Sequence, residues 1–325
     1  MKTYILIWVL LIVSCGLFSA ANCSKDKVDL LSRGLIKNQP NFTGRLVFHN
    51  YTCYSCNDSK LFLYDFRSNT LTGISDTWGI SNPMNAHFSP DGKSIVFMGV
   101  TPGSGWDVFR WRIGTVVNPQ NLTRLSGNTR DEDPKYSFDG NKIVFKQNGV
   151  IKEMDTLGNI LNSIHVPQTE ASMPYYIKGD GSIIYSGTEP TGTTADILKL
   201  SLQTNTVLPL SANTGVEEYY PVVKDDTSFL FTRWYSTGDR NDQVYLGFLN
   251  GRTPSRLLFN EPGHNFSDAY PINSRYVVLS STRPGGEGGY DLYVADLING
   301  EKWSLYLYNK NINTSREELG AAYIE

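Results

Sequence analysis

The sequence predicts an all-β protein, a six-bladed β-propeller whose ring is closed by strands from the two ends of the chain. The first observation is a short segment that recurs at intervals of 40 to 50 residues. Its copies are "NAHFSPDG" (85–92), "DPKYSFDG" (133–140), "MPYYIKGDG" (173–181), "YPVVKDD" (220–226), "YPINS" (270–274) and "LGAAYIE" (319–325). A period of this length is that of a propeller blade, which has four antiparallel strands.

The second observation concerns the residues after each copy. Runs rich in β-branched and aromatic residues come next and predict second strands: "KSIVFMG", "NKIVFKQ", "SIIYSG", "SFLFTRW" and "YVVLSST". Third strands are predicted at "DVFRWRI", "VIKEMD", "DILKLSL", "QVYLGFL" and "DLYVADL", and outer fourth strands at "NLTRLS" and "NTVLPLS". The Asp-Gly pairs suit tight hairpin turns because Gly tolerates positive φ.

The third observation concerns the ends of the repeat region. "RLVFHN", "KLFLYDF" and "NTLTGIS" match the second, third and fourth strands of a blade that lacks its first strand. "LGAAYIE" is a first strand with nothing after it. The two fragments together make one blade, so we expect six blades over residues 44–325 and a ring without exposed sheet edges.

The N-terminus resembles an export signal. Residues 1–22 hold one Lys followed by an apolar run, and 23–43 are a polar tether. "IVSC" at Cys15 resembles a bacterial lipobox, and "CSKDK" at Cys23 resembles the mature start of Bacteroidetes lipoproteins. Lipid anchoring in the periplasm or at the outer-membrane surface is the expectation. Cleavage near Ala21 with free secretion, or a membrane span retained over 4–21, are the alternatives.

Charge restricts the partners. The formal net charge is −3, and the charged residues are mixed along the chain, so nucleic acid is not an expected partner. We expect a monomer that touches the membrane only through its N-terminal anchor.

The motifs "FSPDGKSIVF", "YSFDGNKIVF" and "GGYDLYVADL" resemble TolB-type propeller repeats over residues 44–325. The resemblance implies a scaffold at the cell envelope that contacts proteins or glycans. Related propellers also accompany prolyl-oligopeptidase hydrolase domains and form oligogalacturonate lyases.

A catalytic set is not evident. The sequence has no Gly-x-Ser-x-Gly elbow, and its histidines stand in different repeats, which does not suggest a metal site: His49, His87, His165 and His264. Cys53 and Cys56 form a Cys-x-x-Cys with no second pair, so a local disulfide is expected in an oxidising compartment.

The loops before the first strands carry carboxylates that we expect to surround one opening of the channel. They are Asp131, Glu132, Asp133, Glu170, Glu217, Glu218, Asp268, Glu317 and Glu318. Either they form a solvated rim that caps backbone N–H groups, or they form a site for a cation such as calcium or for a basic partner.

Longer loops bring further residues to the same opening: Trp106, Arg233, Trp234, Arg240 and Arg283. Aromatic rings beside arginines and carboxylates suit a sugar. Asp107, Asp196 and Asp291 recur before third strands and are expected to be structural. The sequence therefore predicts a non-catalytic scaffold that binds a glycan or an envelope protein. The alternative is a glycan-active enzyme, such as a lyase using carboxylates with Arg233 or Arg240.

Overall fold

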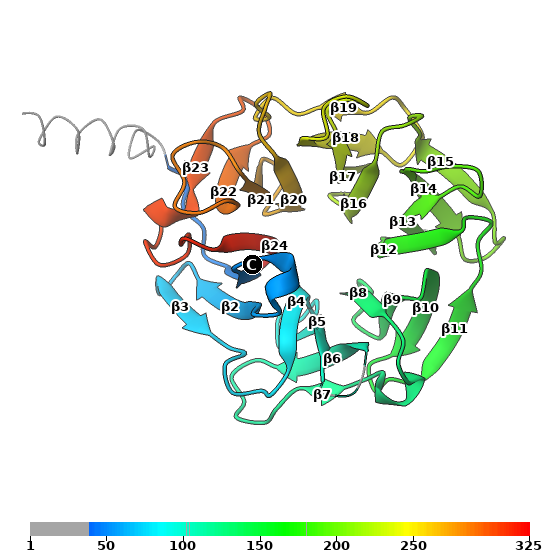
Figure 1. Ribbon diagram of the computed structural model, residues 1–325, viewed down its shortest axis with the longest axis horizontal. Helices are drawn as coiled ribbons and strands as arrows, with labels where there is room; N and C mark the ends of the chain where they lie inside the picture. Colours follow the sequence, from blue (N-terminus) through cyan, green and yellow to red (C-terminus); the bar gives the residue numbers. More distant parts are fainter. Residues whose placement is uncertain (1–38, 102, 104, 180) are drawn as a thin grey trace, which may run out of the picture. The chain divides into compact units, whose positions relative to one another are not determined.

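Six antiparallel sheets of four strands each are arranged around a central axis (Figure 1). The computed structural model describes residues 39–101, 103, 105–179 and 181–325. The predicted signal and residues 23–38 of the predicted tether, including Cys15 and Cys23, lie outside the described residues. Residues 41–325 form one compact unit, and it has the predicted six-bladed propeller fold.

The blades follow one another along the chain. Blade 1 has β24 (Glu317–Ile324), β1 (Arg45–Tyr51), β2 (Lys60–Asp65) and β3 (Thr70–Gly73). Blade 2 has β4 (Ser81–Phe88), β5 (Ser94–Val100), β6 (Trp106–Arg112) and β7 (Gln120–Asn121). Blade 3 has β8 (Asp131–Tyr136), β9 (Lys142–Gln147), β10 (Val150–Asp155) and β11 (Ile160–Ile164).

Blades 4 to 6 repeat this pattern. Blade 4 has β12 (Glu170–Ile177), β13 (Ser182–Thr188), β14 (Ala195–Ser201) and β15 (Val207–Ser211). Blade 5 has β16 (Glu218–Val223), β17 (Ser228–Trp234), β18 (Asp242–Phe248) and β19 (Ser255–Arg256). Blade 6 has β20 (Phe266–Pro271), β21 (Tyr276–Ser281), β22 (Asp291–Asp296) and β23 (Lys302–Ser304). Short 3-10 turns occur at η1 (Tyr54–Cys56), η2 (Arg124–Ser126) and η3 (Leu305–Leu307).

The ring closes as the sequence predicts. β24 pairs antiparallel with β1, and the register joins Arg45 to Ile324 and Val47 to Ala322. β24 is therefore the innermost strand of blade 1, and in Figure 1 its red ribbon lies beside the blue strands of the N-terminal end. By pairing with β1, β24 covers the inner edge that β1 would otherwise expose.

The hydrophobic core lies between neighbouring blades. One cluster joins Phe48 and Tyr64 of blade 1 to Trp303 of blade 6, and another joins Trp78 to Phe97 of blade 2. The second strands are buried on both faces, which explains their nearly continuous apolar runs. Packing between blades therefore positions the inner strands around the axis.

Each innermost strand contains a bulge at one left-handed residue. The six bulge residues are Asn85 (φ 53°), Asp133 (54°), Met173 (52°), Tyr220 (51°), Asp268 (54°) and Gly320 (59°). The ladder register is interrupted at each of these places. Bulges bend a strand and redirect a side chain. We call these six residues the floor ring: five of them line the cavity described below, and Gly320 lines a smaller cavity next to it. Within the described residues, no helix is long and apolar enough to cross a membrane.

A candidate binding cup at the mouth of the channel

A cavity of about 640 Å³ occupies one mouth of the central channel, and we call it the cup. All six blades contribute to its lining. The charged members are Arg130, Glu132, Asp133, Lys146, Glu170, Glu217, Asp242 and Asp268. The aromatic members are His49, Tyr51, Tyr54, Tyr219, Tyr220, Trp234 and Tyr290. A cavity of this size is within the range of small-molecule sites.

Strand alternation decides which predicted carboxylates reach the cup. In each inner strand, the residue just before the floor-ring residue lines the cup. Glu132 and Tyr219 are two examples. Side chains one position earlier point the other way because the period of a strand is two residues. Asp131, Glu218 and Glu318 occupy those earlier positions, and each of them is fully buried away from the cup.

These three buried carboxylates bind neighbouring polar groups. Ser126 and Gln147 donate to Asp131 at 2.7 and 2.9 Å. Arg233 lies 2.7 Å from Glu218 in an ion pair. The structure therefore corrects the expectation that Asp131, Glu218 and Glu318 face the opening: they connect an inner strand to adjacent segments.

Five predicted carboxylates do line the cup: Glu132, Asp133, Glu170, Glu217 and Asp268. Asp242, at the start of β18, is a sixth that sequence reasoning missed. Glu317 is not among the lining residues, and it instead accepts the backbone N–H of Tyr290 at 2.6 Å. Among the described residues, no three His, Cys, Asp or Glu side chains form a group able to hold a metal ion.

The two cations of the cup stand on one wall and are already paired. Lys146 lies 3.2 Å from Glu132 and 2.6 Å from Glu170, and Arg130 also binds Glu132. Neither cation was predicted as a site residue, because Arg130 precedes an inner strand and Lys146 lies within a second strand. This wall is close to neutral.

Asp242 lies on another wall between two tyrosines. Tyr219 donates a short hydrogen bond to it, and the Tyr290 hydroxyl donates at 3.4 Å. Burial raises the pKa of Asp242 to about 6, and the charge of Asp268 adds to that rise. Burial likewise raises the pKa of Asp268 to about 6. Both carboxylates are desolvated, and no Lys or Arg in the described part of the chain forms an ion pair with either of them.

Trp234 lines the cup as predicted, but the other residues of the long loops do not. Arg240 stacks on the Trp234 ring at 4.7 Å, outside the lining. Arg283 pairs with Glu261 at 3.5 Å, and Arg233 is held by Glu218. Trp106 pairs with Arg130 through an isolated backbone bridge and does not line the cup. Of the predicted aromatic and basic set, only Trp234 lines the cup.

Below the floor ring, polar side chains cross the channel. His87 accepts the Tyr136 N–H at Nδ1 (3.2 Å), so in its neutral form Nε2 carries the proton. Nε2 lies 3.2 Å from the Tyr175 hydroxyl and 3.4 Å from that of Tyr270. Burial lowers the pKa of His87 well below its usual value and that of His49 to about 3. Both histidines are therefore neutral packing groups at neutral pH.

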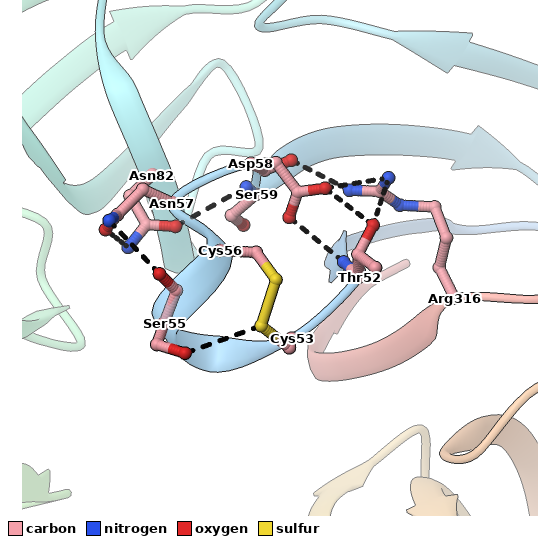
Figure 2. Close-up of a disulfide and its surroundings, with 9 residues drawn as sticks. All are labelled: Thr52, Cys53, Ser55, Cys56, Asn57, Asp58, Ser59, Asn82 and Arg316. Atoms are coloured by element: carbon pink, nitrogen blue, oxygen red, sulfur yellow. Dashed lines mark hydrogen bonds and ion pairs between the residues drawn. A yellow bond between two sulfur atoms is a disulfide. The ribbon is translucent and has the colours of Figure 1, made fainter.

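A disulfide loop forms part of the rim (Figure 2). Cys53 and Cys56 are joined by a disulfide on either side of Tyr54, and Tyr54 lines the cup. Arg316 fastens the loop: it donates to the Thr52 hydroxyl at 3.1 Å and to the Asp58 carbonyl at 2.8 Å, as Figure 2 shows. The loop thus holds one aromatic wall in place from blade 1.

The raised pKa of Asp268 leads to a stability prediction. A carboxyl whose pKa rises from 3.8 to about 6 on folding contributes stability below pH 3.8, and that contribution is lost as pH rises through 6. The unfolding free energy of Asp268→Asn minus that of wild type should therefore rise by roughly 2 kcal/mol from pH 4 to pH 7, because only wild type loses this contribution. Denaturant titrations at each pH measure the difference.

Asp91→Asn is the control for this prediction, because turn hydrogen bonds lower the pKa of Asp91. Its difference from wild type should stay constant between pH 5 and pH 7. A difference for Asp268→Asn that is equally constant would contradict the prediction.

Comparison with known proteins supports the fold alone. No protein-family model matches the sequence, and no curated protein matches it. Among solved structures, TolB from Acinetobacter baumannii has a TM-score of 0.67 at 14% identity, over 91% of this chain and 70% of that one. Hydrazine synthase from Kuenenia stuttgartiensis has a TM-score of 0.69 at 12% identity, over 87% of this chain and 47% of that one.

An oligogalacturonate lyase from Vibrio parahaemolyticus has a TM-score of 0.55 at 13% identity, over 82% of this chain and 76% of that one. The chain thus has the TolB-like six-bladed propeller fold. Because proteins of such different names share it, function has to be argued from the cup.

Proposed function

We propose that this protein is a non-catalytic binding scaffold of the cell envelope that takes a glycan or a segment of a protein partner into the cup. The observation that carries the proposal is the lining itself. Six tyrosine and tryptophan side chains surround a cavity of about 640 Å³ that also contains six carboxylates.

A sugar suits such a lining for two reasons. Apolar sugar faces stack on aromatic rings, and tyrosine hydroxyls and carboxylates accept or donate hydrogen bonds to sugar hydroxyls. Of the two candidate ligands, we favour the glycan, because the aromatic rings that a sugar would stack on line the cup, and the contacts among His87, Tyr175 and Tyr270 span the channel below it.

Export to the envelope is part of the proposal. It is supported by the signal-like residues 1–22 and by the Cys53–Cys56 disulfide, since disulfides persist in oxidising compartments. Anchoring through Cys15 or Cys23 is the proposed membrane attachment.

A glycan-active enzyme is the second candidate function. Asp242 favours it, because a carboxyl with a pKa of about 6 beside the Tyr219 and Tyr290 hydroxyls could exchange protons near neutral pH. Arg233 and Arg240, the arginines that a lyase was expected to use, lie outside the lining, which argues against that enzyme.

Direct binding tests the proposal. The purified protein is titrated against a polysaccharide panel by calorimetry, and product formation is recorded in the same samples. We expect a ligand to bind without turnover, and Trp234→Ala and Tyr290→Ala each to weaken it at least 10-fold, because each removes a ring from the lining.

Trp106→Ala is the matched control, since Trp106 is an aromatic residue of a nearby strand that does not line the cup. It should bind like wild type. If Trp234→Ala and Tyr290→Ala retained wild-type affinity for every ligand, the cup would not be the binding site. Product formation that Asp242→Asn abolishes would favour the enzyme.

A further inference from the structure

Two carboxylates of the floor ring stand on opposite blades. Asp133 belongs to blade 3 and Asp268 to blade 6, which are three blades apart in a ring of six. Both residues have φ 54°, and both line the cup. The bulge therefore brings two negative charges from opposite sides toward the same floor.

These two carboxylates accept few hydrogen bonds from the described part of the protein. Asp133 is 7% exposed, and within the described part of the chain its direct hydrogen bond comes from Asn85 Nδ2 at 2.8 Å, on one oxygen. Asp268 accepts from Ser267 Oγ at 3.0 Å and from the Gly320 N–H at 3.2 Å. Across the described residues, neither carboxylate has a Lys or Arg nitrogen within salt-bridge distance.

The lysines and arginine near the floor form no ion pair with Asp133 or Asp268 in the described part of the chain. Arg130 and Lys146 are bound to Glu132 and Glu170 on one wall. Lys135 lies two residues beyond the floor ring in the small cavity below it, and its Nζ donates to the Pro134 carbonyl at 3.4 Å. Lys135 acts on Asp133 and Asp268 through its charge, without forming an ion pair with either.

Aromatic rings stand around the same position. Tyr51, Tyr220 and Tyr290 line the cup, and the charge of Asp268 acts on all three hydroxyls. Ring faces attract a cation through their quadrupoles, most strongly where water is excluded. Opposed carboxylates beneath aromatic rings are a suitable receptor for an organic ammonium group.

Resting on the proposed glycan-binding function, we propose that the cup recognises an amino sugar, whose ammonium group binds between Asp133 and Asp268 while its ring packs against the tyrosines. The ammonium supplies a direct ionic partner, which Lys135 does not, because Lys135 acts on these carboxylates without forming an ion pair with either. It donates to the free oxygen of Asp133 and to Asp268, and N-acetylation removes the charge on which this binding depends.

The test compares two probes by calorimetry, the disaccharide of glucosamine and its N-acetylated counterpart. Wild type should bind the glucosamine disaccharide at least 10-fold more tightly than the acetylated form. Asp133→Asn/Asp268→Asn should reduce that affinity at least 10-fold. Asn keeps the side-chain shape and favours the left-handed backbone, so the double variant retains the fold, which its melting temperature checks.

Asp226→Asn is the control, because Asp226 lies exposed in the turn after β16 and is absent from the cup. It should bind the glucosamine disaccharide like wild type. Equal affinity of the double variant and wild type for this probe would overturn the inference.

Failure of the inference can be told from failure of the proposed function. If the acetylated disaccharide or another neutral glycan binds equally to wild type and the double variant, and Trp234→Ala abolishes that binding, the cup binds glycans but not through an ammonium. If a trilysine peptide binds through Asp133 and Asp268 while the glucosamine disaccharide does not, the assignment to an amino sugar is wrong.

Discussion

Removal of residues 319–325 is expected to abolish cooperative folding of the whole ring. β24 is the inner strand of blade 1, and its Ala321, Ala322 and Tyr323 are buried in clusters that join blade 1 to blades 2 and 6. Truncation would expose the inner edge of β1 and the faces of both neighbouring blades. We expect a loss of more than about 5 kcal/mol, comparable with the total stability of a domain.

Thermal melts followed by circular dichroism measure this effect. A synthetic peptide of residues 317–325 is the control, since it supplies the missing strand in trans and should restore part of the transition. A truncated chain that melts at the temperature of the full chain would refute the role of β24 in closure.

Gly320→Ala is expected to lower the unfolding free energy by roughly 2 to 4 kcal/mol. Gly320 has φ 59°, which a residue with a Cβ adopts at a cost. An added Cβ would also lie 2.5 Å from His49 Cε1 and 3.0 Å from Asn85 Oδ1. His49 is only 3% exposed, so it has little room to move away. Urea titration measures the change.

Gly79→Ala separates the two causes of this loss. Gly79 has φ 67°, but no atom lies within 4 Å of its added Cβ, so only the backbone cost applies. We expect about 1 kcal/mol for this control. Equal losses for the two variants would show that the contact with His49 and Asn85 is relaxed at little cost.

Several features of the protein could be predicted from the sequence because they depend on repetition. Each blade repeats the same order of turn, apolar run and amphipathic run, so the number of blades and the closure by "LGAAYIE" can be deduced from spacing. The Cys53–Cys56 spacing likewise indicated the bond that the structure contains. Such patterns are local, and short-range sterics and side-chain periodicity are enough to explain them.

The membership of the cup depended on tertiary structure. Glu217 and Glu218 are neighbours in sequence, yet Glu217 lines the cavity and Glu218 is buried against Arg233. "YYP" of β16 reads as an ordinary core strand, but it places Tyr219 and Tyr220 in the lining. One residue of displacement reverses the direction of a side chain, and loop sequences do not reveal that displacement.

The fold, the number of blades, the strands that close the ring and the presence of acidic residues near one opening all follow from the spacing of the repeats. Which of those acids come together in the cup depends on how the blades pack. The deciding feature is the bulge at the floor ring, where residues as unlike as Met173, Tyr220 and Asp133 share one left-handed conformation. Side chains of such different chemistry leave no common signal in the sequence. Packing of six blades around one axis imposes the conformation on them, because the surrounding contacts over-determine each strand.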